Sequence, residues 1–172
     1  MKPVLAAAAA ILSLVAANPA AAALAVGDSA PDFSIDGAQG STRMTVALAE
    51  LRQKGPVVIF FFPSAFTDAP ECRDFAANID AFRAAGASVV GISRDSLDTL
   101  ARFSAEECAA KVPLARADES LVNGFDVNDG AMFNTRTTYV VAPSGKIAFV
   151  NDDMDYAGHA KSALAFVQGM AR

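Results

Sequence analysis

A continuous apolar run at residues 57–62 constrains the fold of this 172-residue chain more than any other stretch. The run reads Val-Val-Ile-Phe-Phe-Phe, and turn-forming residues bound it, with Gly55 and Pro56 before it and Pro63 after it. A strand with one face in water alternates apolar and polar residues, whereas a strand covered on both faces is apolar throughout. We therefore expect residues 57–62 to form a central strand of a sheet that carries helices on both faces.

The segment after this strand has the pattern of an amphipathic helix. Over residues 71–85 the apolar side chains recur at spacings of three and four, which places them on one helix face. Gly86 is a helix stop, and residues 88–92 form a second short apolar run. Strand, helix and strand in succession predict parallel pairing with a right-handed crossover. Cys72 lies where the helix begins, a common layout for redox chemistry on a thiol.

The rest of the chain completes a single domain over residues 26–172. The expected elements are an N-terminal hairpin or extended entry over 26–46, a short helix at 46–51, a helix at 97–108, a short strand at 112–115, a helical turn at 121–125, a β-hairpin at 137–150 and a final helix at 157–170. Cys108 would lie near the end of the second long helix, on the face of Leu97. This order predicts an α/β protein of thioredoxin-like fold, with a central mixed β-sheet flanked by helices.

The first 25 residues have the three parts of a secretory signal peptide. Lys2 gives the positive start, an apolar run follows, and small residues at 20–25 offer cleavage sites. The apolar run is shorter than the roughly 20 residues of a membrane span, although an uncleaved anchor is the alternative. We expect a periplasmic or secreted protein with no membrane attachment after cleavage. The net charge of −5 argues against nucleic acid or an anionic membrane surface as a partner.

The chain has two cysteines, Cys72 and Cys108, and one histidine, His159. In an exported protein, paired cysteines tend to form disulfides. The cysteines have no CxxC spacing, which disfavours a thiol–disulfide oxidoreductase, and a single histidine gives no plausible zinc site. The sequence therefore implies neither a metal nor an organic cofactor. We expect His159, at the start of the last helix, to be a surface or capping residue, and the acidic residues at 151–155 to form a solvated loop.

The strand-to-loop stretch resembles the peroxiredoxin (AhpC/TSA) family. The run Phe-Phe-Pro-Ser-Ala-Phe-Thr at residues 61–67 is similar to the motif Pro-x-x-x-Thr-x-x-Cys, which carries the peroxide-reactive cysteine of that family. The similarity continues through residues 84–93 and 136–146 and through the opening at 26–33, so it covers most of residues 26–170. The chain is most similar to the peroxiredoxin Q, or bacterioferritin-comigratory, group in an exported form.

The resemblance implies an enzyme, a thiol-dependent peroxidase that reduces hydrogen peroxide or organic hydroperoxides. Cys72 would attack the peroxide and Cys108 would resolve the resulting sulfenic acid as an intramolecular disulfide. Arg136 would stabilise the thiolate and Thr67 would bond the peroxide, while Pro63 matches the proline of the motif. A thioredoxin-like or other dithiol donor would then reduce the disulfide, and we expect a monomer or weak homodimer.

One departure from the family pattern keeps a second hypothesis open. Counting three residues on from Thr67 leads to Pro70, whereas counting back from Phe75 leads to a position near Asp68, and neither is a cysteine. The loop is thus two residues shorter than the motif requires. The alternative is a catalytically degraded thioredoxin-fold protein, with a binding or structural role and a structural disulfide. Both hypotheses expect Cys72 and Cys108 to be bonded to each other in the oxidised protein.

Overall fold

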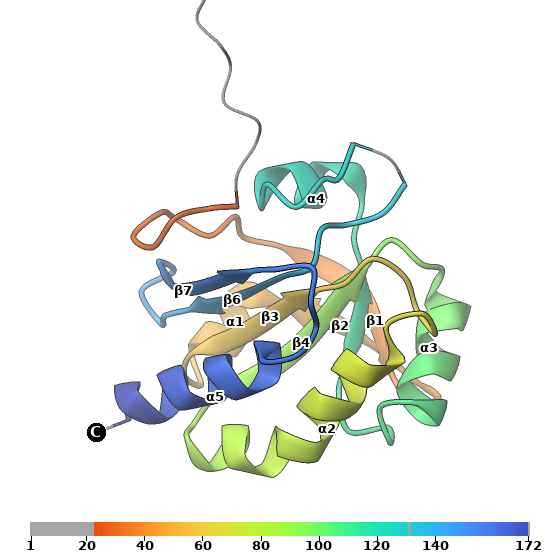
Figure 1. Ribbon diagram of the computed structural model, residues 1–172, viewed down its shortest axis with the longest axis horizontal. Helices are drawn as coiled ribbons and strands as arrows, with labels where there is room; N and C mark the ends of the chain where they lie inside the picture. The colour runs from red at the N-terminus through yellow and green to blue at the C-terminus, as the bar shows by residue number, and fades with distance from the viewer. Residues whose placement is uncertain (1–22, 131, 172) are drawn as a thin grey trace, which may run out of the picture.

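A mixed sheet of seven strands organises residues 23–130 and 132–171, which are the residues that the computed structural model describes (Figure 1). The elements in chain order are β1 (Ser34–Gln39), β2 (Thr42–Ala47), α1 (Leu48–Arg52), β3 (Val57–Phe61), α2 (Ala69–Ala84), β4 (Ser88–Ser93), α3 (Leu97–Glu106), β5 (Leu114–Arg116), α4 (Glu119–Gly124), β6 (Thr137–Val141), β7 (Ile147–Asp152) and α5 (His159–Met170). The expected N-terminal hairpin, the β3-α2-β4 unit and the C-terminal hairpin and helix are all present.

The strands are ordered β2-β1-β5-β4-β3-β6-β7 across the sheet. The central strands β3, β4 and β5 are parallel, and the outer pairs on both sides are antiparallel. The mixed sheet and thioredoxin-like fold expected from the sequence are therefore confirmed. Since β3 and β4 are parallel neighbours, the chain must cross from the end of one to the start of the other, and α2 is that crossover.

The strand predicted to be central, β3, is buried over its whole length. Its side chains alternate between two hydrophobic clusters: Val58 and Phe60 lie in the cluster that includes side chains from α2, α3 and α5, while Val57 and Ile59 lie in the cluster with α1 and α4. In Figure 1, α2 and α5 lie together on one side of the sheet and α4 on the other. The run is apolar throughout because helices cover both faces.

The aromatic core above β3 depends on one glycine in the neighbouring strand. The ring of Phe60 stacks on Phe75 of α2, with 4.1 Å between the ring centroids. A Cβ atom at Gly91 of β4 would lie 2.5 Å from the Phe60 ring and 2.6 Å from Leu114. The absence of a side chain at Gly91 therefore lets Phe60 lie flat under α2, which fixes the height of that helix over the sheet.

Two boundaries near the cysteines differ from the sequence prediction. Helix α2 begins two residues earlier than expected, at Ala69, with Pro70 in its first turn, where proline costs no hydrogen bond. Helix α3 ends at Glu106, so Cys108 lies beyond the helix rather than on its last turn. Ala109 and Ala110 both have φ near +52°, and this left-handed backbone turns the chain away from the helix axis. The periodicity of the sequence could not reveal that turn.

The signal peptide expected over residues 1–25 lies almost entirely outside the described residues. Of its last residues, Ala23 and Leu24 pack against the core, and the Leu24 N–H donates a hydrogen bond to the Tyr139 hydroxyl at 3.0 Å. Tyr139 in turn donates to the carbonyl of Phe125 at 2.8 Å. The segment before β1 is thus tied to β6. Among the described helices, none is long and apolar enough to cross a membrane.

Candidate active site

The loop between β3 and α2 is held by side chains at both of its ends. It starts at Pro63, where β3 has ended, and Asp68 is the N-cap residue of α2. One carboxylate oxygen of Asp68 accepts a hydrogen bond from the Ser64 N–H at 2.8 Å, and Asp95 accepts one from the Ala65 N–H, also at 2.8 Å. The loop is therefore a short, fixed connection that presents the first turn of α2 toward β6.

Thr67 and Phe66 lie on the outer side of this loop. The Thr67 hydroxyl is directed to the loop's own carbonyls at Ser64 and Ala65, both at 3.4 Å. Phe66 has a left-handed backbone with φ of +65°, and its exposed ring packs edge-on against Phe103 of α3. The N-cap residue of α2 is Asp68, whose side chain makes no capping hydrogen bond to that helix.

The two cysteines form a disulfide, as both hypotheses expected. Cys72, in the first turns of α2, is bonded to Cys108, just beyond α3, with 5.4 Å between the Cα atoms. Both residues are fully buried in the hydrophobic cluster that α2, α3 and α5 share. The adjacent residues Arg73 and Glu107 form an ion pair across the same two elements. A covalent bond and a charge pair therefore join the start of α2 to the end of α3.

Arg136, which immediately precedes β6, is buried and binds two carboxylates of α2. One terminal nitrogen of its guanidinium contacts Asp68 and the other contacts Glu71. The remaining nitrogen, Nε, donates a hydrogen bond to the carbonyl of Met154 at 2.9 Å. All three nitrogens of the Arg136 side chain thus have oxygen partners, and two acidic groups share one cation in a region that excludes water.

Burial of Glu71 changes its protonation. Its side chain is about 1 % exposed, and removal from water raises the pKa of Glu71 to about 8, although the Arg136 charge acts in the opposite direction. A proton on Glu71 at neutral pH leaves one carboxylate, that of Asp68, opposite the Arg136 cation. The second oxygen of Glu71, Oε1, has no hydrogen-bond partner among the described residues and lies 3.7 Å from Nδ1 of His159.

His159 is not the surface or capping residue that the sequence predicted. It is fully buried at the start of α5, where its Nδ1 lies 2.9 Å from the Thr138 hydroxyl and its Nε2 lies 2.9 Å from the Asp153 carbonyl. A carbonyl can only accept, so Nε2 carries the proton and, in the neutral ring, Nδ1 accepts from Thr138. Burial lowers the pKa of His159, which favours this neutral form.

The structure thus does not bring all of the predicted site residues together, and Pro63 and Thr67 lie in the loop between β3 and α2. Cys72 and Cys108 lie together in the hydrophobic core, while Arg136 belongs to a buried polar cluster that we call the arginine cluster, made of Asp68, Glu71, Arg136 and His159. Sequence reasoning did not place Asp68 or Glu71 in the site, and it expected His159 to be a surface or capping residue. A signal for Asp68 existed, because counting back from Phe75 placed it near the cysteine position of the family motif. Among the described residues, no group of histidine, cysteine or acidic side chains could hold a metal ion.

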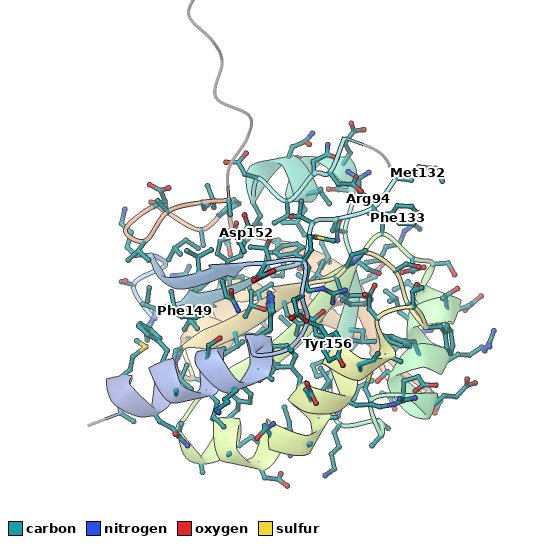
Figure 2. The ribbon with its side chains drawn as sticks, viewed as in Figure 1. Arg94, Met132, Phe133, Phe149, Asp152 and Tyr156 are labelled. Atoms are coloured by element: carbon teal, nitrogen blue, oxygen red, sulfur yellow. A yellow bond between two sulfur atoms is a disulfide. The ribbon has the colours of Figure 1, made fainter. Side chains whose placement is uncertain are left out.

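Exposed apolar side chains lie on the loop after α4 and on the segment before α5. Met132 and Phe133 project from the loop after α4, and Tyr156 lies near the start of α2 (Figure 2). Phe133 precedes Asn134, whose buried side-chain amide donates to the carbonyl of Ile92 at 3.3 Å. The loop after α4 is thus anchored to the ends of the central strands.

Comparison with known proteins decides the family. The AhpC/TSA family matches residues 26–150, which is well over half of the chain. The chain belongs to the AhpC/TSA family. Peroxiredoxin Bcp of Escherichia coli K12 is 31 % identical over 147 residues, covering 79 % of this chain and 90 % of that protein. Peroxiredoxin Bcp of Xanthomonas campestris is 32 % identical over 127 residues, covering 67 % and 78 %.

Solved structures agree with this membership of the AhpC/TSA family. Peroxidoxin BcpB from Mycobacterium tuberculosis superimposes with a TM-score of 0.74 at 32 % identity, covering 84 % of this chain and 97 % of that one. A cysteine-to-serine variant of Xanthomonas campestris Peroxiredoxin Q gives a TM-score of 0.70 at 27 % identity, with coverage of 81 % and 92 %. These relatives confirm both the thioredoxin-like fold and the peroxiredoxin assignment expected from the sequence, and their names agree with the expected class of thiol peroxidase.

Proposed function

We propose that this protein is an exported thiol peroxidase that reduces hydrogen peroxide or organic hydroperoxides through Cys72 and Cys108. The observation that carries the proposal is the disulfide between these residues, because it is the product that a peroxidatic and a resolving cysteine form. Membership of a family whose relatives are named peroxiredoxins supports the same chemistry.

The cycle starts from the reduced protein. The Cys72 thiolate attacks one peroxide oxygen, the O–O bond breaks, and the other oxygen leaves with a proton as water or an alcohol. Cys72 is then a sulfenic acid, having lost two electrons to the peroxide. The Cys108 thiol attacks that sulfur and releases water, which forms the disulfide. An external dithiol, thioredoxin-like or of another kind, returns two electrons and two protons through a mixed disulfide.

The surroundings of Cys72 define what must change on reduction. Because the Cys72 side chain is about 1 % exposed in the disulfide form, the first turns of α2 must open before peroxide can reach it. In the reduced form Arg136 would exchange Asp68 or Glu71 for the Cys72 thiolate, since its nitrogens are otherwise occupied. Thr67 and Pro63, in the loop before α2, would then line the peroxide position.

Measurement of peroxide consumption tests the proposal directly. Reduced protein mixed with one equivalent of hydrogen peroxide should consume the peroxide, lose two thiols and form the Cys72–Cys108 disulfide. A Cys108→Ser variant should consume peroxide once and stop at a sulfenic acid that dimedone traps on Cys72. If a Cys72→Ser variant removes peroxide as fast as the unmodified protein, this assignment fails.

A second candidate function is favoured by the Asp68–Arg136 ion pair. The carboxylate of Asp68 occupies the side of Arg136 where a reactive thiolate would otherwise lie. In this alternative the protein is a structural or binding module, and the disulfide stabilises the fold without turning over. It predicts that a thioredoxin-like dithiol leaves the disulfide of the folded protein intact, whereas the peroxidase proposal requires rapid reduction of that bond.

A further inference from the structure

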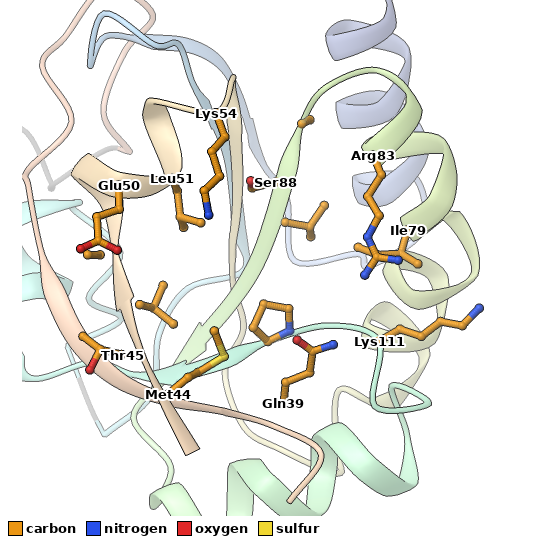
Figure 3. A pocket seen from close by; sticks show the side chains of 15 residues that line it. Gln39, Met44, Thr45, Glu50, Leu51, Lys54, Ile79, Arg83, Ser88 and Lys111 are labelled. Atoms are coloured by element: carbon orange, nitrogen blue, oxygen red, sulfur yellow. The ribbon is translucent and has the colours of Figure 1, made fainter. Parts of the chain in front are cut away.

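A groove separate from the arginine cluster lies at the opposite edge of the sheet. It has a cavity volume of about 460 Å³ and runs between β2 and α1 on one side and α2 on the other (Figure 3). Ser88, the first residue of β4, lines the groove, whereas the candidate active site follows the carboxyl end of β3. Neither cysteine nor Arg136 lines this groove, so a ligand bound there needs no part of the proposed peroxidase chemistry.

The floor of this groove is apolar. It is made by side chains from β2, α1, α2, β4 and the loop before β5. Val46, Ile79 and Val89 are buried, and Leu51 and Pro113 are partly buried. The side chain of Met44, 38 % exposed, stands at the rim. Volumes of this size and mixed linings are usual for small-molecule sites, which lie between about 300 and 1,000 Å³.

The rim of the groove is positively charged, contrary to the rest of the chain. Lys54, Arg83 and Lys111 line it against one acidic residue, Glu50. The whole chain has 14 basic and 19 acidic residues, so an excess of cations around one groove opposes the overall charge. Arg83 pairs with Asp80 at 3.1 Å, but both side chains are well exposed and such pairs are weak.

The cations are placed to hold one end of a ligand. Figure 3 shows Lys54 and Arg83 on opposite walls of the groove, with Ser88 of β4 between them, while the ammonium of Lys111 is directed outward. The apolar side chains of Leu51 and Ile79 lie beside Lys54 and Arg83, respectively. Two cations facing across an apolar floor complement a molecule with one anionic head and a hydrocarbon body. Electrostatic complementarity of this kind selects the charge of the ligand, and the apolar floor supplies the burial.

We propose that this groove binds a fatty-acid anion, with its carboxylate between Lys54 and Arg83 and its alkyl chain along Val46, Ile79 and Val89. A free fatty acid fits better than a phospholipid surface, because the bound chain lies in a groove between elements and the overall charge of the protein is repelled by anionic membranes.

Titration of the oxidised full chain with decanoate at low salt tests the proposal. Amide resonances of residues 44–54, 79–89 and 111–112 should shift and saturate, and decanol, which lacks the charge, should bind at least about threefold more weakly. A Lys54→Glu/Arg83→Glu variant should lose at least about tenfold in affinity, since two attractive exposed contacts become repulsive.

Lys146→Glu provides the matched control. This lysine is exposed and contacts Ser29, away from the groove, so its reversal changes the net charge equally and should leave decanoate affinity within about twofold. The proposal is overturned if the groove resonances do not saturate, if the double charge reversal binds decanoate unchanged, or if decanol binds as tightly as decanoate. The proposal is also overturned if the protein does not bind decanoate but sediments with anionic phospholipid vesicles. That result would favour a lipid surface as the ligand.

Discussion

Asp68 and Arg136 form a buried ion pair between the start of α2 and the start of β6. Asp68 stands near the position where counting back from Phe75 places the reactive cysteine of the family motif. The Asp68 carboxylate therefore neutralises the Arg136 guanidinium, as we expect a cysteine thiolate at that position to do. Substitutions of Asp68 and Arg136 can therefore test what this buried ion pair does.

An Asp68→Cys substitution should create a reactive thiol. In the oxidised protein it is the sole free cysteine of the variant, and Arg136 beside it should depress its pKa below the usual 8.5. The rate of alkylation by iodoacetamide as a function of pH gives that pKa. Asp74→Cys, an exposed position on the same helix, is the control and should titrate near the ordinary value. Equal pKa values for the two thiols would contradict the expectation.

Removal of the Arg136 charge should destabilise the fold strongly. Arg136→Met leaves the Asp68 carboxylate buried without its cation, which costs about 3–5 kcal/mol of unfolding free energy. The double variant Asp68→Asn/Arg136→Met removes both charges and should recover much of that loss. Urea unfolding of the oxidised variants measures both effects. A single variant as stable as the unmodified protein would show that the pair is not effectively buried.

The raised pKa of Glu71, about 8, predicts a pH dependence of stability. The folded protein keeps the Glu71 proton at pH values where the unfolded chain has released it. The contribution of Glu71 to the free energy of unfolding is fully present below the ordinary pKa of 4.5. It is lost as pH rises through about 8, by at most about 1.4 kcal/mol per pH unit. Asp68 and Asp74 add to the upward shift and Arg136 opposes it.

A Glu71→Gln variant isolates this contribution, because glutamine is neutral at every pH. The lowered pKa of His159 gives the opposite slope, a stability that grows as pH rises through about 6.5, and it should act in both proteins. The difference in unfolding free energy between Glu71→Gln and the unmodified protein should therefore increase from pH 5 to pH 8. A constant difference over that range would refute a protonated Glu71.

Reduction of the disulfide should lower stability substantially. The bond closes a loop with a sequence separation of 36, and the loss of chain entropy in the unfolded state corresponds to about 3–4 kcal/mol. Denaturant midpoints of the oxidised protein and of a Cys72→Ala/Cys108→Ala variant measure this difference. Identical midpoints would mean that the bond does not restrict the unfolded chain.

The contacts of Leu24 predict where a signal peptide would be removed. Ala20 and Ala22 fit the small-residue pattern before a cleavage site, and a mature chain beginning at Ala23 keeps the hydrogen bond from Leu24 to Tyr139. Cleavage after residue 25, the boundary expected from the sequence, would delete that contact, so we now expect the earlier boundary. N-terminal sequencing of protein recovered outside the cytoplasm should give Ala23, and a first residue at Val26 or later would contradict the prediction.

The fold could be predicted from local patterns, and the arginine cluster could not. The apolar run of β3 and the helical spacing of α2 predicted the central strand and its crossover, because each pattern reports which faces are covered. His159 was predicted to lie at the surface and is buried, since its partners Thr138 and Glu71 come from other elements. One histidine at a helix start carries no signal for such contacts.

The disulfide could also be predicted from the sequence, whereas the partners of Arg136 could not. The pairing of Cys72 with Cys108 was predictable because the chain has no other cysteine. The partners of Arg136 were not, because Asp68 and Glu71 are brought to it only when α2 packs beside β6. Counting along the family motif led us to expect a loop two residues short, but it could not place these carboxylates in space.

The disulfide also sets how far this protein can be stretched. The segment between Cys72 and Cys108 contains the whole of α3 and the central strand β4. A force applied at the two termini therefore passes through the disulfide and does not stretch that segment. The oxidised chain should then extend to a contour length shorter than that of the reduced chain by roughly 120 Å, at about 3.5 Å per residue. The unfolded oxidised chain would also have to enter a narrow pore with two chain segments side by side at the disulfide. A chain exported in the unfolded state must therefore cross the membrane before this bond closes.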